Sequence, residues 1–347
     1  MGKNLVFVAG LMVILSCMPL SSLFGQDSLP ENDYYEAFPY HLTSRIYLSR
    51  KYTSLMIRDK ATDQSYHYMP NSTLNLGIGA TYRDLTLNVA YGFGFLNPEK
   101  GRGESKYFDA QTHLYPKKFV IDVFLQFYKG YHLLPEGLGA ASGESYYTRP
   151  DMRVRKIGAS FQYVFNHGEF SYRAAFLQNE WQKKSAGTFL LGFEMFGGMA
   201  EEESNFIPAH LVEIPDRNFS TLKFLDFGPN AGYAYTWVFK EHFFITGSAS
   251  ASLGAGYSTL LGAQGEHTEW GINPNYLLRG FAGYNSAKWS LNANYVYDNV
   301  ALQENREFSN SVMTGNYRLN FVYRFMPGPR IKRYLKVVDY IKDKLPG

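Results

Sequence analysis

The sequence predicts an all-β protein, a transmembrane up-and-down antiparallel β-barrel of about 14 strands with a short C-terminal amphipathic helix. Three observations predict it: apolar residues alternate with small or polar residues along most of the chain, short turns keep these two faces in register, and aromatic residues flank the turns. The composition agrees, because 17% of the 347 residues are aromatic and only 19% are charged. A net charge of +3 without a basic stripe excludes a typical nucleic-acid-binding protein.

The N-terminus has the pattern of an export signal. Lys3 precedes the apolar run 5–15, and small residues up to Gly25 favour cleavage there. A lipoprotein signal at Cys17 is the alternative, although Leu15 fits that motif badly. We therefore divide the chain into a signal peptide (1–25), a periplasmic N-terminal segment (26–41), a transmembrane β-barrel (42–326) and a basic periplasmic tail (327–347).

The clearest strand lies at residues 85–95, where Leu, Val, Tyr and Phe alternate with Thr, Asn, Ala and Gly. The same pattern recurs at 245–257, 289–298 and 317–325. Each run matches the roughly 9–11 residues with which a tilted strand crosses a bilayer. A soluble sandwich would carry Lys and Glu on its polar face, where these strands carry Gly, Ser, Ala and Asn. The pattern therefore favours a closed barrel in a membrane.

Short turns predict the register of the hairpins. They centre on residues 83–84, 116–117, 166–169, 240–242 and 285–288. The expected cross-strand pairs include Gly79 with Asn88, Gln111 with Asp122, Gln162 with Arg173, and Arg279 with Asn294. The aromatic residues beside these turns would form a girdle at one depth of the membrane: Tyr82, Phe119, Phe165, Phe170, Phe239, Phe243, Tyr284 and Trp289.

Longer connections are expected at the opposite end of the barrel, near residues 59–68, 97–104, 130–150, 258–272 and 299–313. The strand count depends on segment 197–222. A single loop there would make the short and long ends change places, so we interpret Phe206 to Ile214 as a weak strand. This gives about 14 strands, and a barrel of 12 is the alternative if 178–222 folds differently.

The polar face of the strands is expected to line the interior. Its larger candidate residues are Asp109, Gln111, His113, Asp122, Gln126, Gln162, Arg173, Arg279, Asn294, Arg318 and Arg324. They could brace the wall through hydrogen bonds or select a solute. Small residues at 77–94 and 248–254 line the rest of the wall and would leave room inside. Water, an infolded loop such as 130–150, or a ligand is expected to fill that room.

No pattern typical of catalysis or of metal binding occurs in the sequence. Among the eight histidines, only His113 falls on a clear strand, where a hydrogen-bonded interior residue is the usual role. The acidic segments 201–203 and 266–269 lack the spacing of metal sites. We therefore expect no enzyme, no metal and no cofactor, with an outer-membrane lipid hydrolase as a remote alternative.

The chain continues beyond its last predicted strand. Phe325 ends that strand with an aromatic residue, as the barrel-assembly machinery recognises, and Pro327 breaks it. Apolar residues recur at helical spacing from Ile331 to Leu345, and residues 330–345 carry an excess of Lys and Arg. These residues predict a basic amphipathic helix that could contact a periplasmic partner. A solvated tail is the alternative.

Three motifs point to a known family: Tyr68-Met69-Pro70-Asn71, Lys184-Ser185-Ala186-Gly187-Thr188-Phe189-Leu190-Leu191, and Asn230-Ala231-Gly232-Tyr233-Ala234-Tyr235. With them the chain resembles an uncharacterised family of Bacteroidota outer-membrane proteins, a domain of unknown function. The resemblance covers nearly all of the chain after the signal. It implies a barrel in the outer membrane, and it brings no substrate, catalytic residue or cofactor.

Together these features lead to two expectations about function. The first is a porin-like outer-membrane barrel for passage or binding of a small solute or lipid, with outer-membrane lipid and the barrel-assembly machinery as its partners. The second is a structural or assembly barrel with a plugged interior, whose basic tail contacts a periplasmic partner.

Overall fold

The computed structural model describes residues 32–83, 85–116, 118–212, 218–262 and 265–344, so the expected signal peptide lies outside the described residues. One structural unit comprises Asn32–Met326, and a second contains the C-terminal helix α3 (Pro329–Lys344). Pro329 occupies the first helical position, where its missing N–H costs no hydrogen bond. The predicted C-terminal helix is therefore confirmed. No helix of the described residues is long and apolar enough to cross a membrane.

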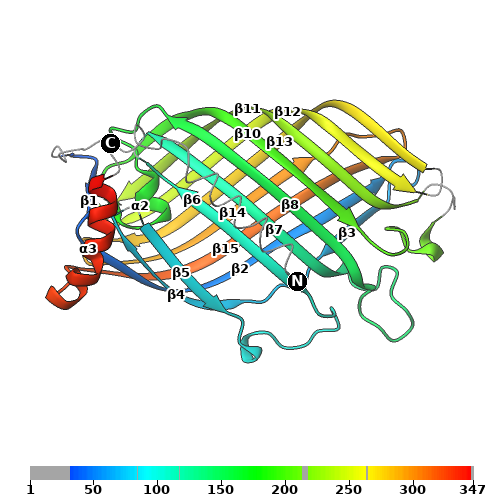
Figure 1. The fold of residues 1–347 in the computed structure, drawn as a ribbon, viewed down its shortest axis with the longest axis horizontal. Coiled ribbons are helices and arrows are strands. Elements are labelled where there is room, and N and C mark those ends of the chain that lie inside the picture. Colours follow the sequence, from blue (N-terminus) through cyan, green and yellow to red (C-terminus); the bar gives the residue numbers. More distant parts are fainter. Residues whose placement is uncertain (1–31, 84, 117, 213–217, 263–264, 345–347) are drawn as a thin grey trace. The chain divides into compact units, whose positions relative to one another are not determined.

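Ten antiparallel strands close a ring, which confirms the predicted barrel (Figure 1). Pairing of the last strand with the first long strand, β15 with β2, closes it from Phe308 opposite Asp59 to Phe325 opposite Leu42. In ring order the strands are β2 (Leu42–Asp59), β3 (Ser65–Met69), β7 (Phe119–Leu134), β8 (Thr148–Val164), β10 (Ala186–Glu201), β11 (Phe219–Phe239), β12 (Phe243–Gly262), β13 (Gly265–Asn285), β14 (Trp289–Ala301) and β15 (Phe308–Phe325).

The ring has ten strands rather than the expected 14 or 12, because three strands attach beside it. Strand β4 (Asn75–Tyr82) pairs with the first half of β2 and carries β5 (Leu85–Tyr91). Strand β6 (Lys106–Leu114) pairs with β7. The short β3 joins β2 to β7 at the far end of the barrel and thereby completes the ring without these three.

The two faces of the strands follow the alternation of the sequence. On β12, Thr246, Ser248 and Ser250 are buried inside the barrel, while Ile245 and Leu253 are exposed on the outer surface. Apolar exposure on this scale is unfavourable in water and favourable in hydrocarbon. The alternation therefore produces a polar interior and an apolar exterior.

The register agrees with the prediction at two turns and differs at two others. Gly79 lies opposite Asn88, and Phe239 lies opposite Phe243, as expected. By contrast, Asp122 pairs with His113 rather than Gln111, and Asn294 pairs with Phe281 rather than Arg279. Each of these two turns is centred one residue later than assumed, which shifts the pairing by two residues. A shift of two keeps every side chain on its predicted face.

The expected hairpin around residues 166–169 is wrong. The chain after β8 instead forms α2 (Tyr172–Phe176) and β9 (Glu180–Gln182), which pairs with the N-terminal strand β1 (Tyr35–Ala37). Ser171 begins α2 as its N-cap, because its Oγ accepts a hydrogen bond from the backbone N–H of Ala174 at 3.0 Å. Gln162 consequently lies opposite Gly192 of β10, not opposite Arg173.

A strand at Phe206 to Ile214 was expected because it kept the short and long connections at opposite ends of the barrel. The connection from β8 through α2 and β9 to β10 achieves this without such a strand. Residues 206–208 form no strand, and η3 (Ala209–Leu211) is a single turn of 3-10 helix. Residues 213–214 lie outside the described part. The expected long loops at 258–272 and 299–313 are also mostly strand, because alternation continues to Gly262, from Gly265, to Ala301 and from Phe308.

Candidate functional site

The interior of the barrel is filled at three levels. A plug segment, residues 170–182, lies inside the end with the short turns. A polar belt of charged and amide side chains follows. An apolar cluster occupies the opposite end. One of the expected fillings, an infolded segment, is therefore present, and it is residues 170–182 rather than 130–150.

The plug segment is held against the wall by aromatic contacts and hydrogen bonds. The ring centroid of Phe176 lies 4.2 Å from that of Phe281 on β13, and the hydroxyl groups of Tyr172 and Ser248 are 2.8 Å apart. Two arginines of the wall bind the carbonyl groups that follow α2. Arg45 donates to the carbonyl oxygen of Leu177 at 3.1 Å, and Arg324 donates to that of Gln178. These bonds satisfy acceptors that the end of a helix leaves free.

The polar belt contains two ion pairs. Lys156 of β8 pairs with Asp298 of β14, and Asp122 of β7 pairs with Arg279 of β13. His113 Nδ1 lies 2.6 Å from the other carboxylate oxygen of Asp122. All four charged groups of the two pairs are buried, and such groups are kept inside a protein only when they are paired.

A second group of belt residues surrounds the buried carboxylate of Glu194. Asn230 Nδ2 donates to one oxygen at 3.1 Å, and Ser252 Oγ donates to the other at 2.6 Å. Gln162 Nε2 extends this network to Asn230 Oδ1 at 3.2 Å and to Ser250 Oγ at 3.0 Å. The network joins β8, β10, β11 and β12 on their inner face.

Ten of the eleven predicted interior residues lie at inward positions of the strands: Asp109, Gln111, His113, Asp122, Gln126, Gln162, Arg279, Asn294, Arg318 and Arg324. Arg173 differs, because it belongs to α2, where its Nε lies 3.3 Å from Glu180. The list of predicted interior residues omits Lys156, Glu194 and Asp298, although the alternation had placed Asp298 on the polar face. Their signal was present, since Lys156 lies in the same alternation as Gln162, and Asp298 in that of Asn294.

The predicted aromatic girdle has a different composition. Phe165, Phe239, Phe243 and Trp289 are exposed on the outer surface, and Tyr284 lies with its ring centroid 4.4 Å from that of Trp289. Phe119 is half-buried. Phe170 is buried in the plug segment against Tyr172, because residues 170–182 fold inward. Tyr82 is also buried. Neither Phe170 nor Tyr82 belongs to an exposed girdle.

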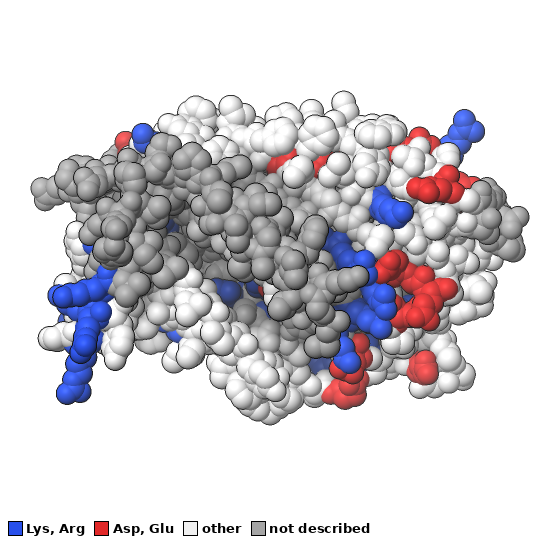
Figure 2. All heavy atoms as spheres, in the orientation of Figure 1, with Lys and Arg blue, Asp and Glu red and all other residues white. Residues whose placement is uncertain are grey.

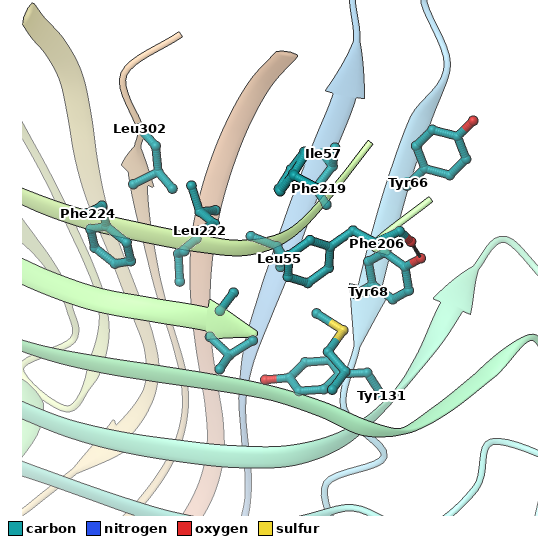
Figure 3. Close-up of a cluster of buried hydrophobic side chains, with 14 of the residues drawn as sticks. Leu55, Ile57, Tyr66, Tyr68, Tyr131, Phe206, Phe219, Leu222, Phe224 and Leu302 are labelled. Atoms are coloured by element: carbon teal, nitrogen blue, oxygen red, sulfur yellow. Dashed lines mark hydrogen bonds between the residues drawn. The ribbon is translucent and has the colours of Figure 1, made fainter. Parts of the chain in front are cut away.

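The apolar cluster closes the other end of the barrel (Figure 3). Phe206 inserts from the loop after β10 and packs on Phe219 at 5.2 Å between ring centroids. The hydroxyl of Tyr68 donates to the carbonyl oxygen of Phe206, and the hydroxyl of Tyr131 to that of Thr53 at 2.9 Å. The cluster thus combines a dry apolar interior with satisfied hydroxyl groups. Its other labelled members are Leu55, Ile57, Tyr66, Leu222, Phe224 and Leu302.

The wall has a side opening between β5 and β6. Strand β5 pairs only with β4 and β6 only with β7, so their facing edges have no strand partner among the described residues. Asn88 and Ala90 lie at inward positions of β5 and are nevertheless exposed. Lys51 of β2 and Asp109 of β6 form an ion pair of 3.6 Å inside it. Figure 2 shows this face hollowed at its middle, with atoms of basic side chains visible in the hollow.

The outer surface carries a groove of about 1020 Å³ over β11 to β14. Small residues form its floor, namely Gly247, Ala249 and Gly280, and Trp237 and Tyr295 stand among the aromatic side chains of its walls. The groove faces away from the polar belt and suits apolar contact with lipid.

The His113–Asp122 pair could orient a base, but Arg279 holds the same carboxylate, and no described serine forms a hydrogen bond with His113. Within the described ranges, no group of three or more His, Cys, Asp or Glu residues is placed to hold a metal ion.

Comparison with solved structures found distant likenesses to outer-membrane proteins. They include OprG from Pseudomonas aeruginosa (11% identity, 84% of this chain and 98% of that chain, TM-score 0.23) and the Ralstonia pickettii toluene transporter TbuX (8%, 81% and 89%, 0.29). The beta domain of the Bordetella autotransporter Brka gives 9%, 79% and 98%, with a TM-score of 0.30. A comparison with curated proteins found no match. A family model, described as a domain of unknown function (DUF4421), matches residues 26–325, and the chain therefore belongs to that family.

Proposed function

We propose that this chain is an outer-membrane β-barrel protein whose interior binds or passes a small solute or lipid. One observation carries the proposal: a closed ring of strands has a polar, charged inner face and an apolar outer face. Phe189, Leu253 and Ile272 are 68%, 63% and 69% exposed on that outer face. Only a closed barrel satisfies every backbone group of spanning strands in lipid.

The filled interior defines the kind of passage that this barrel supports. The plug segment, the polar belt and the apolar cluster occupy successive levels, so an open aqueous pore does not fit the described residues. A solute would have to displace these side chains or enter from the side. Binding and gated passage are therefore favoured over free diffusion.

The test begins with cell fractionation and continues with the purified protein. The full chain should appear in the outer-membrane fraction. In planar bilayers it should give gated conductance, or mass spectrometry of the native protein should detect a retained small molecule. Recovery in the soluble periplasm, or a membrane protein with neither conductance nor ligand, would contradict the proposal.

A second candidate is a structural or assembly barrel, which the plug segment favours. Its partner would bind α3, where Arg330, Lys332, Arg333 and Lys336 are exposed. Crosslinking from Lys336 should then capture a periplasmic protein, and a pull-down with the full-length chain should recover that protein, whereas a pull-down with the chain lacking residues 327–347 should not. A deletion that changes neither capture nor membrane assembly would eliminate this role.

A further inference from the structure

We infer that the side opening between β5 and β6 admits the head group of a single-chain carboxylate amphiphile, which binds Lys51 and Arg318 inside the barrel while its acyl chain remains between the two strand edges. This inference rests on the proposed function and names the substrate class. Four features support it: the free strand edges, the cationic side chains behind them, unpartnered polar atoms beside those cations, and the filled interior.

The strand edges make the opening unusual for a membrane barrel. Backbone groups that lack hydrogen-bond partners are strongly unfavourable in hydrocarbon, so membrane barrels normally leave no strand edge unpaired. Here β5 and β6 both leave one edge unpaired over the described residues. On this side β2 also has no strand partner at residues 50–54 in the described structure, because β4 pairs with residues 43–49 and β3 with residues 55–58. The opening thus leads from the membrane side to the inward residues of β2.

Two cations lie directly inside. Lys51 pairs in register with Asn316 of β15, and Arg318 follows two residues later on the same inward face. Neighbours in such a diagonal lie roughly 7–8 Å apart, close enough for one head group to touch both. Arg318 stacks on Tyr47 at 4.4 Å from the ring centroid, and no ion pair joins it to a carboxylate of the described residues. Among the described residues, the ion pair of Lys51 is the 3.6 Å contact with Asp109.

Polar atoms near these cations also lack partners. Arg318 Nε, Gln111 Nε2 and Asn316 Oδ1 are buried and form no hydrogen bond within the described structure. Gln111 and Asn316 are themselves joined by a hydrogen bond of 3.4 Å, so these atoms belong to one site. Buried polar atoms without partners are costly, and a bound group with acceptor oxygens would satisfy the two donors.

The size and charge of the ligand follow from the surroundings. The site presents two cationic side chains. A carboxylate suits them because it carries a negative charge and two oxygens that accept hydrogen bonds. Behind it, Gln126 bonds Thr314 at 3.2 Å and Lys156 pairs with Asp298, so the interior offers no space for a bulky head group. The opening meets the apolar outer surface at Leu87 and Val89, where an acyl chain is favourable. A fatty acid satisfies these conditions, and a two-chain phospholipid does not.

The experiment measures equilibrium binding of palmitate to the full-length protein in neutral detergent. Hexadecanol, with the same chain and no charge, and dipalmitoyl phosphatidylglycerol, with two chains, are the comparison probes. We expect palmitate to bind at least tenfold more tightly than either. Lys51→Gln combined with Arg318→Gln should weaken palmitate binding about tenfold or more, whereas Lys51→Arg with Arg318→Lys should retain most of it.

Matched variants separate the opening from general effects on the membrane surface. Ala90→Trp places a bulky ring at an inward position of β5 and should weaken binding, while Ile245→Trp on the outward face of β12, away from the opening, should not. Lys223→Gln, an exposed charge on β11, is the charge control. Circular dichroism confirms that each variant is folded.

Equal binding of palmitate and hexadecanol, or no effect of the Gln pair or of Ala90→Trp, overturns the inference. If the protein then conducts or retains another solute, the proposed function stands without this ligand. If it neither conducts nor retains any solute, both fail.

Discussion

Lys156 and Asp298 form an ion pair across the full width of the barrel, and their side chains are 0% and 4% exposed. In the ring of ten strands, β8 and β14 are five positions apart in either direction and therefore face each other. Asp122 and Arg279 repeat this relationship between β7 and β13. Side chains from opposite walls thus meet in the middle, which closes the interior and braces the wall.

Replacing one member of this pair should destabilise the barrel strongly. Lys156→Met leaves Asp298 buried without a cation, and loss of one partner of a buried pair costs about 3–5 kcal/mol. Urea unfolding of the protein in detergent micelles, followed by tryptophan fluorescence, measures the change. The double variant Lys156→Met with Asp298→Leu should recover most of the stability. Equal destabilisation by the single and the double variant would show that the pair itself is not responsible.

Opening the plug should increase conductance. Tyr172→Ala with Phe176→Ala removes the contacts to Ser248 and Phe281 that hold α2 against the wall. The short helix cannot persist without such packing, because helices of this length are unstable alone. Single-channel recording should therefore show larger or more frequent openings. Phe165→Ala, which truncates an exposed outer residue, should leave the recordings unchanged. No difference between the two variants would mean that the plug does not limit passage.

The sequence was sufficient for the faces of the strands because alternation is a local property. Successive residues of β12 point alternately into and out of the barrel, as Ser248 and Ile245 do. This alternation can be read from the strand's own sequence, without knowledge of the rest of the chain. The predicted cross-strand partner of Asn294 differed from the observed one by two residues, and the side chain of Asn294 still lies on its predicted inward face. The all-β barrel and the inward residues were therefore predictable.

What fills the barrel was not predictable, since it depends on contacts between distant parts of the chain. Lys156 and Asp298 are 142 residues apart in sequence. The three-residue strand β9 forms because β1 pairs with it, and no local pattern at Glu180 reveals that partner. The low number of strands in the ring also depends on contacts between distant residues, because the five-residue strand β3 joins β2 to β7.

Stability should depend on pH through Glu202, which follows β10. Arg149 contacts this carboxyl but also forms two hydrogen bonds with Asp151, at 3.2 and 2.9 Å, so one cation serves two acids. Burial raises the pKa of Glu202 from its ordinary 4.5 to about 8, against the attraction of Arg149 and with the repulsion of Asp151.

The sign of this dependence follows from the raised pKa. The folded protein holds a proton that the unfolded chain releases, so the stability contribution is fully present below about pH 4.5 and is lost as pH rises through about 8. Unfolding temperatures should be measured from about pH 4 to about pH 9, a range that brackets this window. They should fall as the pH rises. Glu202→Gln should flatten this part of the curve, whereas Glu203→Gln should not. An unchanged slope in Glu202→Gln would assign the dependence to another group.

Phe206 should anchor the loop that follows β10. Its side chain is 0% exposed and packs on Phe219 in the apolar cluster, while Phe95 is 78% exposed. Removing a fully buried phenylalanine costs about 3–5 kcal/mol, because the transfer free energy is lost and a cavity remains. Phe206→Ala should therefore lower the urea midpoint and increase proteolysis of residues 202–212, and Phe95→Ala should do neither. If instead Phe206→Ala leaves both unchanged, the loop does not need this contact, and the apolar cluster must be held closed by its strand residues alone.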